Sequence, residues 1–220
     1  MAAFLANVGV NAAHAARSPL FEDGSFVLLP IPERIPWREP MLRVRDLPDA
    51  QMHAPRSWAD RPVHHDPDLA SANATYGDNC RRAGRAFSLR HARPGDLIVF
   101  VARLHAASPG FHVVGCLEIV DAIEDVTRDP GPGWWDTNAH VRRARATDAW
   151  DSFWVFRGSK RSRLLERGIP FTKREAETLF GTGLQWPAHR TELQTIGSYT
   201  RAVRRIDGQG EEWLRTVCLT

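Results

Sequence analysis

The sequence has few cysteines and no long apolar run. Its three cysteines, Cys80, Cys116 and Cys218, are widely spaced and form no CxxC pair. Neither a disulfide framework nor a zinc site built on thiolates is therefore indicated. No apolar stretch reaches the roughly 18 to 20 residues that a membrane helix needs. The apolar N-terminus lacks the basic region of a signal peptide, so we expect a cytoplasmic protein without a membrane partner.

Several catalytic motifs are also missing. The chain contains no GxSxG nucleophile elbow, no GxxxxGK[ST] phosphate loop and no GxGxxG dinucleotide turn. These absences argue against a serine hydrolase of the α/β type, a P-loop nucleotidase and a dinucleotide-dependent oxidoreductase. Cys116 lies inside an apolar stretch, which favours inert packing over a nucleophilic role. The sequence identifies no cofactor.

Lysine is scarce, whereas arginine is abundant. Only Lys160 and Lys173 are lysines among 29 basic residues, and the formal net charge is +3. Arginine binds phosphate through a planar, bidentate fork. A GC-rich genome would enrich arginine equally well, so the count alone does not predict a polyanionic partner.

The pattern of apolar residues predicts one α+β domain spanning residues 1–220. Val, Ile and Phe dominate residues 97–104 and 112–123, and Ser108-Pro109-Gly110 between them predicts a central hairpin. Thr172 and Glu175 form a capping box for a helix over 173–180. Further strands are predicted at 3–10, 25–29, 86–90 and 150–156, a short helix or ordered loop at 69–82, and a closing helix at 210–219. Strands and short helices do not alternate, which favours α+β over a doubly wound sheet.

A proline-rich segment separates the first strands from the central hairpin. Prolines recur at positions 32, 36, 40, 48, 55 and 62. Each removes an amide donor and disfavours helix in the preceding residue. We expect residues 30–67 to cross the surface without regular structure.

The strongest candidate site follows this segment, at His64-His65-Asp66-Pro67-Asp68. Alternation in an extended chain would place His64, Asp66 and Asp68 on one side and His65 on the other. Three hypotheses remain open. The carboxylates cap turns around Pro67, the group binds or converts a ligand, or it holds a metal ion with His140 as a further ligand. The spacing matches no established metal motif, and we assign no metal site.

The loop after the first strand carries a second group, His14, Arg17 and Ser18. A phosphate or carboxylate of a ligand would suit Arg17 if the loop faces a site at the end of the sheet. The alternative is a surface arginine paired with Glu22 or Asp23, which contributes little stability.

Two further segments combine aromatic and basic residues. Trp134 and Trp135 precede a polar group that comprises Asn138, His140 and Arg142. The indoles either stack on a base or pack on the sheet. A basic turn follows a predicted strand, with Arg157, Ser159, Lys160 and Arg161. It either contacts a phosphodiester backbone or is a solvated charged turn.

The order of short motifs resembles the nucleotide modification associated domain 3 family along nearly the whole chain. The motifs are Arg17-Ser18-Pro19, Asp23-Gly24, Pro30-Ile31-Pro32, His65-Asp66-Pro67-Asp68-Leu69, Gly95-Asp96-Leu97-Ile98-Val99-Phe100, Gly115-Cys116-Leu117-Glu118-Ile119, Asn138-Ala139-His140-Val141 and Phe156-Arg157-Gly158-Ser159. Members of that family are inferred to accompany DNA base modification in bacteria and phages. The resemblance therefore implies DNA or a nucleotide as partner.

Residues 93–121 are also similar to the central hairpin of PUA-like domains, including the ASCH and EVE domains. Those domains place modified or flipped bases in a pocket of a small barrel. The likeness implies a curved, partly barrel-like mixed sheet with short flanking helices. Val101 to Leu104 follow Phe100 where the family has another aromatic, so an aromatic pocket floor is not implied.

Together these features predict a protein that binds, and in one version converts, a modified base or nucleotide in a polar pocket. His65 or His140 would move protons, with Asp66 or Asp68 orienting the imidazole. Two alternatives are a non-catalytic reader of modified DNA or RNA and a metal-dependent hydrolase of a small phosphorylated compound. The sequence indicates neither the reaction nor the oligomeric state.

Overall fold

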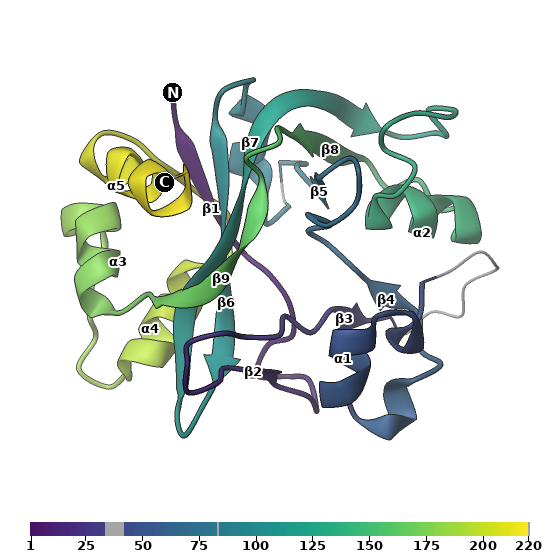
Figure 1. Ribbon diagram of the computed structural model, residues 1–220. Helices are drawn as coiled ribbons and strands as arrows, with labels where there is room; N and C mark the ends of the chain where they lie inside the picture. The colour runs from purple at the N-terminus through teal and green to yellow at the C-terminus, as the bar shows by residue number, and fades with distance from the viewer. Residues whose placement is uncertain (34–41, 83, 220) are drawn as a thin grey trace.

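A large mixed sheet organises the computed structural model, which describes residues 1–33, 42–82 and 84–219 (Figure 1). Eight strands form this sheet in the order β10-β1-β6-β7-β8-β5, with β2 beside β6 and β9 beside β7. The strands are β1 (Ala3–Asn7), β2 (Ser18–Pro19), β5 (Thr75–Asp78), β6 (Leu97–His105), β7 (Pro109–Val126), β8 (Phe153–Gly158), β9 (Arg163–Pro170) and β10 (Arg204–Ile206). A separate ladder pairs β3 (Ile31–Pro32) with β4 (Val63–His64).

The predicted central hairpin is confirmed as β6 and β7. The two strands pair antiparallel from Leu97↔Glu118 to His105↔Pro109. β7 continues beyond this ladder, pairing with β9 through residues 112–116 and with β8 through residues 119–126. Its marked bend is visible in Figure 1. β7 therefore joins the two parts of a curved sheet.

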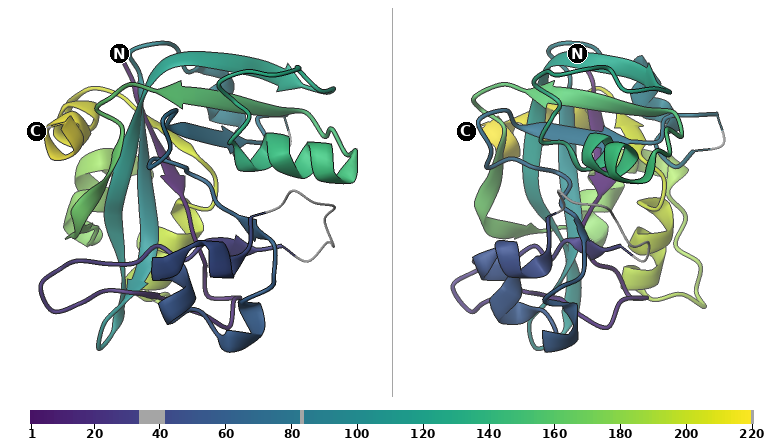
Figure 2. Two further views of the ribbon diagram at one scale, coloured as in Figure 1. Left: turned by 45° about the vertical axis from the view of Figure 1, so that its right-hand side comes forward. Right: turned by 90° about the vertical axis from the view of Figure 1, so that its right-hand side faces the viewer.

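Both faces of the sheet are buried, with alternate residues going to each. Phe4, Ile98 and Phe100 pack on one face, whereas Leu5 and Val99 pack on the other. The second face is covered by α3 (Lys173–Phe180), α4 (Glu192–Tyr199) and α5 (Gln209–Leu219), which lie together on one side in Figure 1. α1 (Pro48–His53), α2 (Ala139–Thr147) and the β3–β4 ladder lie on the other side (Figures 1 and 2).

The expectation of an irregular surface segment at 30–67 is wrong for its described part. That part contains β3, β4, α1 and two 3-10 turns, Val44–Asp46 and Arg56–Trp58. It also builds a small core of its own around Val44, Trp58 and Val63. The prolines sit where they are tolerated: Pro48 is the first residue of α1, a position that needs no amide donor. Residues 34–41, including Pro36 and Pro40, lie outside the described residues.

Other local predictions had mixed outcomes. The strand at 3–10, the capped helix at 173–180 and the closing helix are confirmed as β1, α3 and α5, and the strand at 150–156 corresponds to β8. The strand predicted at 86–90 is instead a 3-10 helix, Phe87–His91, and residues 69–82 contain strand β5. The strand at 25–29 reduces to an isolated bridge, Leu20↔Phe26, around the positive-φ residue Gly24. β9, α2 and α4 were not predicted.

The chain is thus α+β, as predicted, but a PUA-like barrel is not confirmed. The sheet of the described residues runs from β10 to β5 as an open path. None of the helices in the described ranges is long and apolar enough to cross a bilayer.

Candidate functional site

The candidate site lies where the end of β4 meets the start of α2. Asn138 caps α2, and its side-chain oxygen accepts a hydrogen bond from the His140 amide at 3.0 Å. The amide nitrogen of the same side chain donates to Thr75 Oγ1 at 3.3 Å. This fully buried asparagine therefore fixes the first turn of α2 against β5.

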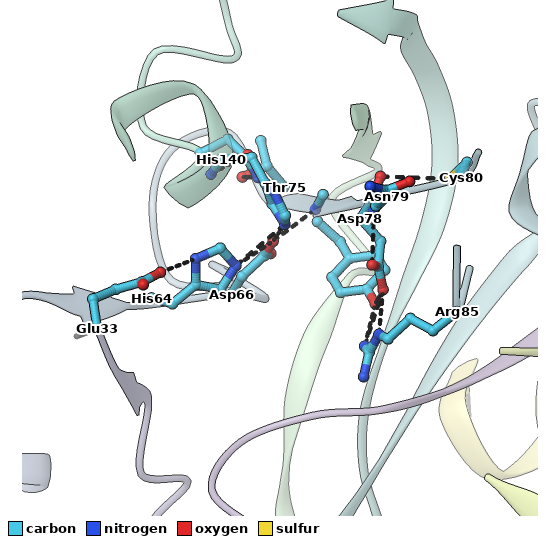
Figure 3. Close-up of polar contacts among 12 residues, drawn as sticks. Glu33, His64, Asp66, Thr75, Asp78, Asn79, Cys80, Arg85 and His140 are labelled. Carbon is cyan, nitrogen blue, oxygen red and sulfur yellow. Dashed lines mark hydrogen bonds and ion pairs between the residues drawn. The ribbon is translucent and has the colours of Figure 1, made fainter. Parts of the chain in front are cut away.

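Two imidazoles and one carboxylate converge at this point (Figure 3). His64 Nε2 lies 3.2 Å from His140 Nε2, and the two rings meet edge to face. Asp66 Oδ2 lies 3.6 Å from His140 Nε2 and 3.9 Å from His64 Nε2. We refer to His64, Asp66 and His140 as the His–Asp–His centre.

Outer contacts orient the members of the centre. Glu33 Oε1 lies 3.2 Å from His64 Nδ1, which turns the Nε2 atom toward His140. The Gly77 amide donates to Asp66 Oδ2 at 2.8 Å. A Cβ atom at Gly77 would lie 2.7 Å from the His140 ring, so only glycine fits there without displacing the imidazole.

Burial sets the electrostatics of the centre. The side chain of Asp66 is 2% exposed, and those of His64 and His140 are 16% exposed each. Burial raises the pKa of Asp66 well above its usual range and lowers the pKa of His140 well below its own. Asp66 Oδ1 is buried and has no hydrogen-bond partner among the described residues. Burial thus favours the uncharged forms of Asp66 and His140, and Asp66 Oδ1 is left as a buried atom available to a further partner.

The donor set suits a divalent transition metal. One atom from each of the three side chains lies within 4.8 Å of the other two. Ligands about 2.1 Å from a shared ion, at angles of roughly 90 to 110°, would lie about 3.0 to 3.4 Å apart. The 3.2 Å distance between the two Nε2 atoms falls in that range. The distances of 3.6 and 3.9 Å from Asp66 Oδ2 to these atoms would need small rotations of the side chains. Glu33 beside the far nitrogen of His64 is the typical outer partner of a metal-binding histidine.

A second polar network borders the centre along β5 (Figure 3). The Tyr76 hydroxyl donates to Asp78 Oδ2 at 2.7 Å, and Arg85 Nε donates to the same oxygen at 2.9 Å. The positive charge of Arg85 opposes the rise that burial causes in the pKa of Asp66, and it adds to the fall that burial causes in the pKa of His140. The two networks are therefore electrostatically connected.

The remaining residues of the His64–Asp68 segment point elsewhere. His65 lines a cavity of about 290 Å³ together with Asp66, Pro67 and apolar residues from the segment before them. Burial lowers the pKa of His65, although Asp68 nearby opposes the shift. Asp68 accepts hydrogen bonds from the amide and hydroxyl groups of Ser71. It thus closes a turn, the structural role weighed for it above.

The group on the loop after β1 does not join the centre. The His14 ring accepts a hydrogen bond from the Asn11 amide at 3.1 Å. Arg17 is exposed and donates to the His14 and Ala16 carbonyls. Ser18 is 1% exposed and its hydroxyl accepts from the Leu29 amide, so its contact is internal to the fold.

The tryptophans and Arg142 lie around α2. Trp134 and Trp135 are half-buried, contact each other edge to face and pack on the small core beneath α2. The Trp135 indole nitrogen donates to the Gly131 carbonyl at 2.9 Å. Arg142 lines a narrow recess that it shares with His65. The two indoles therefore pack mainly on the core beneath α2 and on each other, and are not fully exposed for stacking on a base.

The basic turn after β8 is largely paired with acidic residues. Arg157 contacts Asp121 at 3.3 Å and lies over the Trp134 ring. Arg161 Nε donates to Glu118 at 3.0 Å, and Ser159 Oγ donates to the same carboxylate at 2.6 Å. Lys160 is exposed.

Sequence reasoning gave His64 only an alternative role and missed Glu33 and Gly77. The alternation of His64 with Asp66 predicted that both side chains lie on the same side of an extended segment. It did not predict that this side would face His140. Nothing local to Glu33 marks it, because it reaches the centre through the pairing of β3 with β4.

The chain was compared with protein families, curated proteins and solved structures. Residues 3–213 match the family model described as nucleotide modification associated domain 3. None of the curated proteins matches the chain, and neither does any solved structure.

Proposed function

Because the chain belongs to the nucleotide modification associated domain 3 family, we propose that it binds a nucleotide or modified base and acts on it with a divalent metal ion. The observation that carries this proposal is the convergence of His64, Asp66 and His140, with ligand atoms within 4.8 Å of one another. Two imidazoles and one carboxylate suit Zn²⁺, Mn²⁺ or Fe²⁺. Three protein ligands leave coordination positions open, as in catalytic rather than structural sites.

The reaction class that these groups support is hydrolysis. A divalent ion lowers the pKa of a bound water and supplies hydroxide near neutral pH. As a ligand through Nε2, His140 would not move protons, which revises the role predicted for it. His65 stands outside the ligand set and is the remaining imidazole available as a proton carrier.

The cavity beside Asp66 offers space for the base. It measures about 290 Å³, near the lower end of typical ligand sites, which span about 300 to 1,000 Å³. Phe26, Leu28 and Leu47 supply apolar walls, and His65 supplies a polar group. Such a mixture suits a flat heterocycle with hydrogen-bonding edges.

Metal content tests the proposal directly. We expect about one equivalent of Zn²⁺, Mn²⁺ or Fe²⁺ per chain by elemental mass spectrometry after loading and desalting. His140→Ala should reduce retention at least about tenfold, since one of three ligands is removed. His189→Ala, at an exposed histidine in another part of the chain, is the matched control. Equal metal retention in both variants would overturn the assignment.

Turnover separates this function from that of a non-catalytic reader. The loaded protein is incubated with nucleotides and with modified DNA, and the products are separated by liquid chromatography and mass spectrometry. We expect a hydrolysis product that disappears with chelator and with His64→Ala. Binding without any product, at a full complement of metal, would favour the reader.

A further inference from the structure

A second cavity, of about 520 Å³, lies between the end of β1, β6 and α4, and it shares the lining residue Gly9 with the base-sized one. Three of its lining residues are arginines, namely Arg85, Arg103 and Arg201, and within the described part of the chain none of the lining residues is acidic. Asn7, Asn11 and Gln194 add polar groups that can donate hydrogen bonds. The lining is therefore a concentration of positive charge within a concave surface, which favours an anion.

Arg103 gives the strongest indication that this cavity binds an anion. It extends from β6, in the centre of the sheet, and its Nε atom is buried without a hydrogen-bond partner in the described part of the chain. A buried donor left unpaired costs free energy, and more so when it is charged. Tyr76 and Asp78 hold Arg85 at the wall of the cavity. Arg201 adds an exposed guanidinium at the end of α4.

We propose that this cavity binds the phosphate of a small phosphorylated ligand through Arg103 and Arg201. A guanidinium group donates two parallel hydrogen bonds to two oxygens of the same phosphate. It therefore binds a tetrahedral phosphate with a more specific geometry than the ammonium group of a lysine, which acts as a point charge. The volume is ample for a phosphate group and for part of the ligand that carries it. That the phosphate belongs to a nucleotide rests on the proposed function, whereas the anion site itself rests on the arginines alone.

The cavity adjoins the His–Asp–His centre through the β3–β4 ladder. Ile31 lines the cavity and pairs with His64, and Glu33 follows two residues later. A ligand whose phosphate occupies the cavity would thus lie beside the ladder that carries His64 of the centre.

Calorimetry with chelator-treated full-length protein tests the anion site without the metal. Inorganic pyrophosphate, used as the probe, should bind with one site per chain. Arg103→Gln and Arg201→Gln should each weaken binding about tenfold or more, since each removes a charged hydrogen bond. Lys160→Gln removes one exposed charge elsewhere and should leave affinity unchanged. Absence of binding, or equal affinity in all three variants, would overturn the proposal.

Because Arg201 is exposed, its substitution should not unfold the protein, and thermal unfolding of each variant verifies this. Competition identifies the source of the phosphate. Deoxynucleoside 5′-monophosphates should displace pyrophosphate, whereas nucleosides should not. Displacement only by an oligonucleotide would assign the cavity to a nucleic-acid backbone and contradict the mononucleotide assignment. Since no metal is present, failure of the metal site would not alter these results.

Discussion

At Gly77 the backbone of β5 passes so close to α2 that a side chain has no room. An added Cβ would lie 2.7 Å from the His140 ring and 2.9 Å from Asn138 Oδ1. Gly77→Ala should therefore displace the imidazole, weaken metal binding about tenfold and destabilise the fold by about 1 to 3 kcal/mol. Metal titration and chemical denaturation measure the two effects. Gly183→Ala, whose Cβ would meet its nearest atom at 3.5 Å, is the control and should change neither.

His112 provides a pH-dependent contribution to stability away from the site. Burial lowers its pKa, and its Nδ1 atom donates to the Gly110 carbonyl at 3.3 Å. The unfolded chain, with a histidine pKa near 6.5, takes up a proton more readily than the folded protein. Stability present above pH of about 6.5 is therefore lost as the pH falls below that value.

We expect His112→Gln to reduce the fall in thermal midpoint between pH 7 and pH 5. Calorimetry of both proteins across that range measures the difference. An identical pH dependence would show that His112 contributes nothing to it.

Individual residues were predictable where local pattern determines their position. Asp66 and His140 were both selected from the sequence, and they meet in the structure. His64 and His65 were expected on opposite sides, and His64 joins the centre whereas His65 lines the cavity beside Asp66. Which of the two faces the centre depends on α2, 76 residues further along the chain. No pattern within the segment contains that information.

At the scale of elements, long apolar runs were recognised and short buried elements were missed. β6 and β7 are rich in Val, Ile and Phe and were predicted as a central hairpin. β5 has only four residues, including Gly77 and Asp78, yet all four are buried, because β8 and α2 cover it. α2 buries only Ala139, Val141 and Ala144, so its sequence shows a weak apolar face. Asn138, a typical N-cap residue, was the feature of the sequence that could have predicted this helix.

The capping box of α3 makes a measurable contribution to stability. Glu175 accepts a hydrogen bond from the Thr172 amide at 2.9 Å and another from its hydroxyl. Glu175→Ala should lower the free energy of unfolding by about 1 kcal/mol, because it leaves the cap amide unpaired. Glu177→Ala, which removes only an exposed ion pair with Lys173, should cost no more than about 0.5 kcal/mol. Urea denaturation of both variants makes the comparison, and equal losses would contradict the role of the box.

At the scale of the molecule, the three cysteines lie in the core on both faces of the sheet, with Cys80 on one face and Cys116 and Cys218 in contact with each other on the other. Cys80 follows β5, Cys116 lies on β7 and Cys218 lies on α5, each at most 2% exposed and free. A thiol reagent should therefore modify them only through large-scale opening, at rates that follow global stability. Labelling should be complete within minutes in denaturant and slow by orders of magnitude in buffer. Rapid modification of any one thiol in buffer would reveal local opening at that position.

The overall class was predictable because strands and short helices follow one another without βαβ alternation, which favours α+β over a doubly wound sheet. The open path of the sheet in the described residues was not predictable, because it depends on which strands the bent β7 takes as partners. The small core of the proline-rich segment was not predictable either, because the residues that form it are separated in the sequence by surface residues.

The His–Asp–His centre draws on two parts of the molecule that pack separately. β4 belongs to the small core around Trp58, whereas α2 packs on the one around Phe153. An ion bound to both would act as a cross-link between two regions whose apolar cores are separate clusters. The free energy of metal binding would then be added to that of unfolding. Metal supply would set not only the activity of this protein but also its lifetime in the cell.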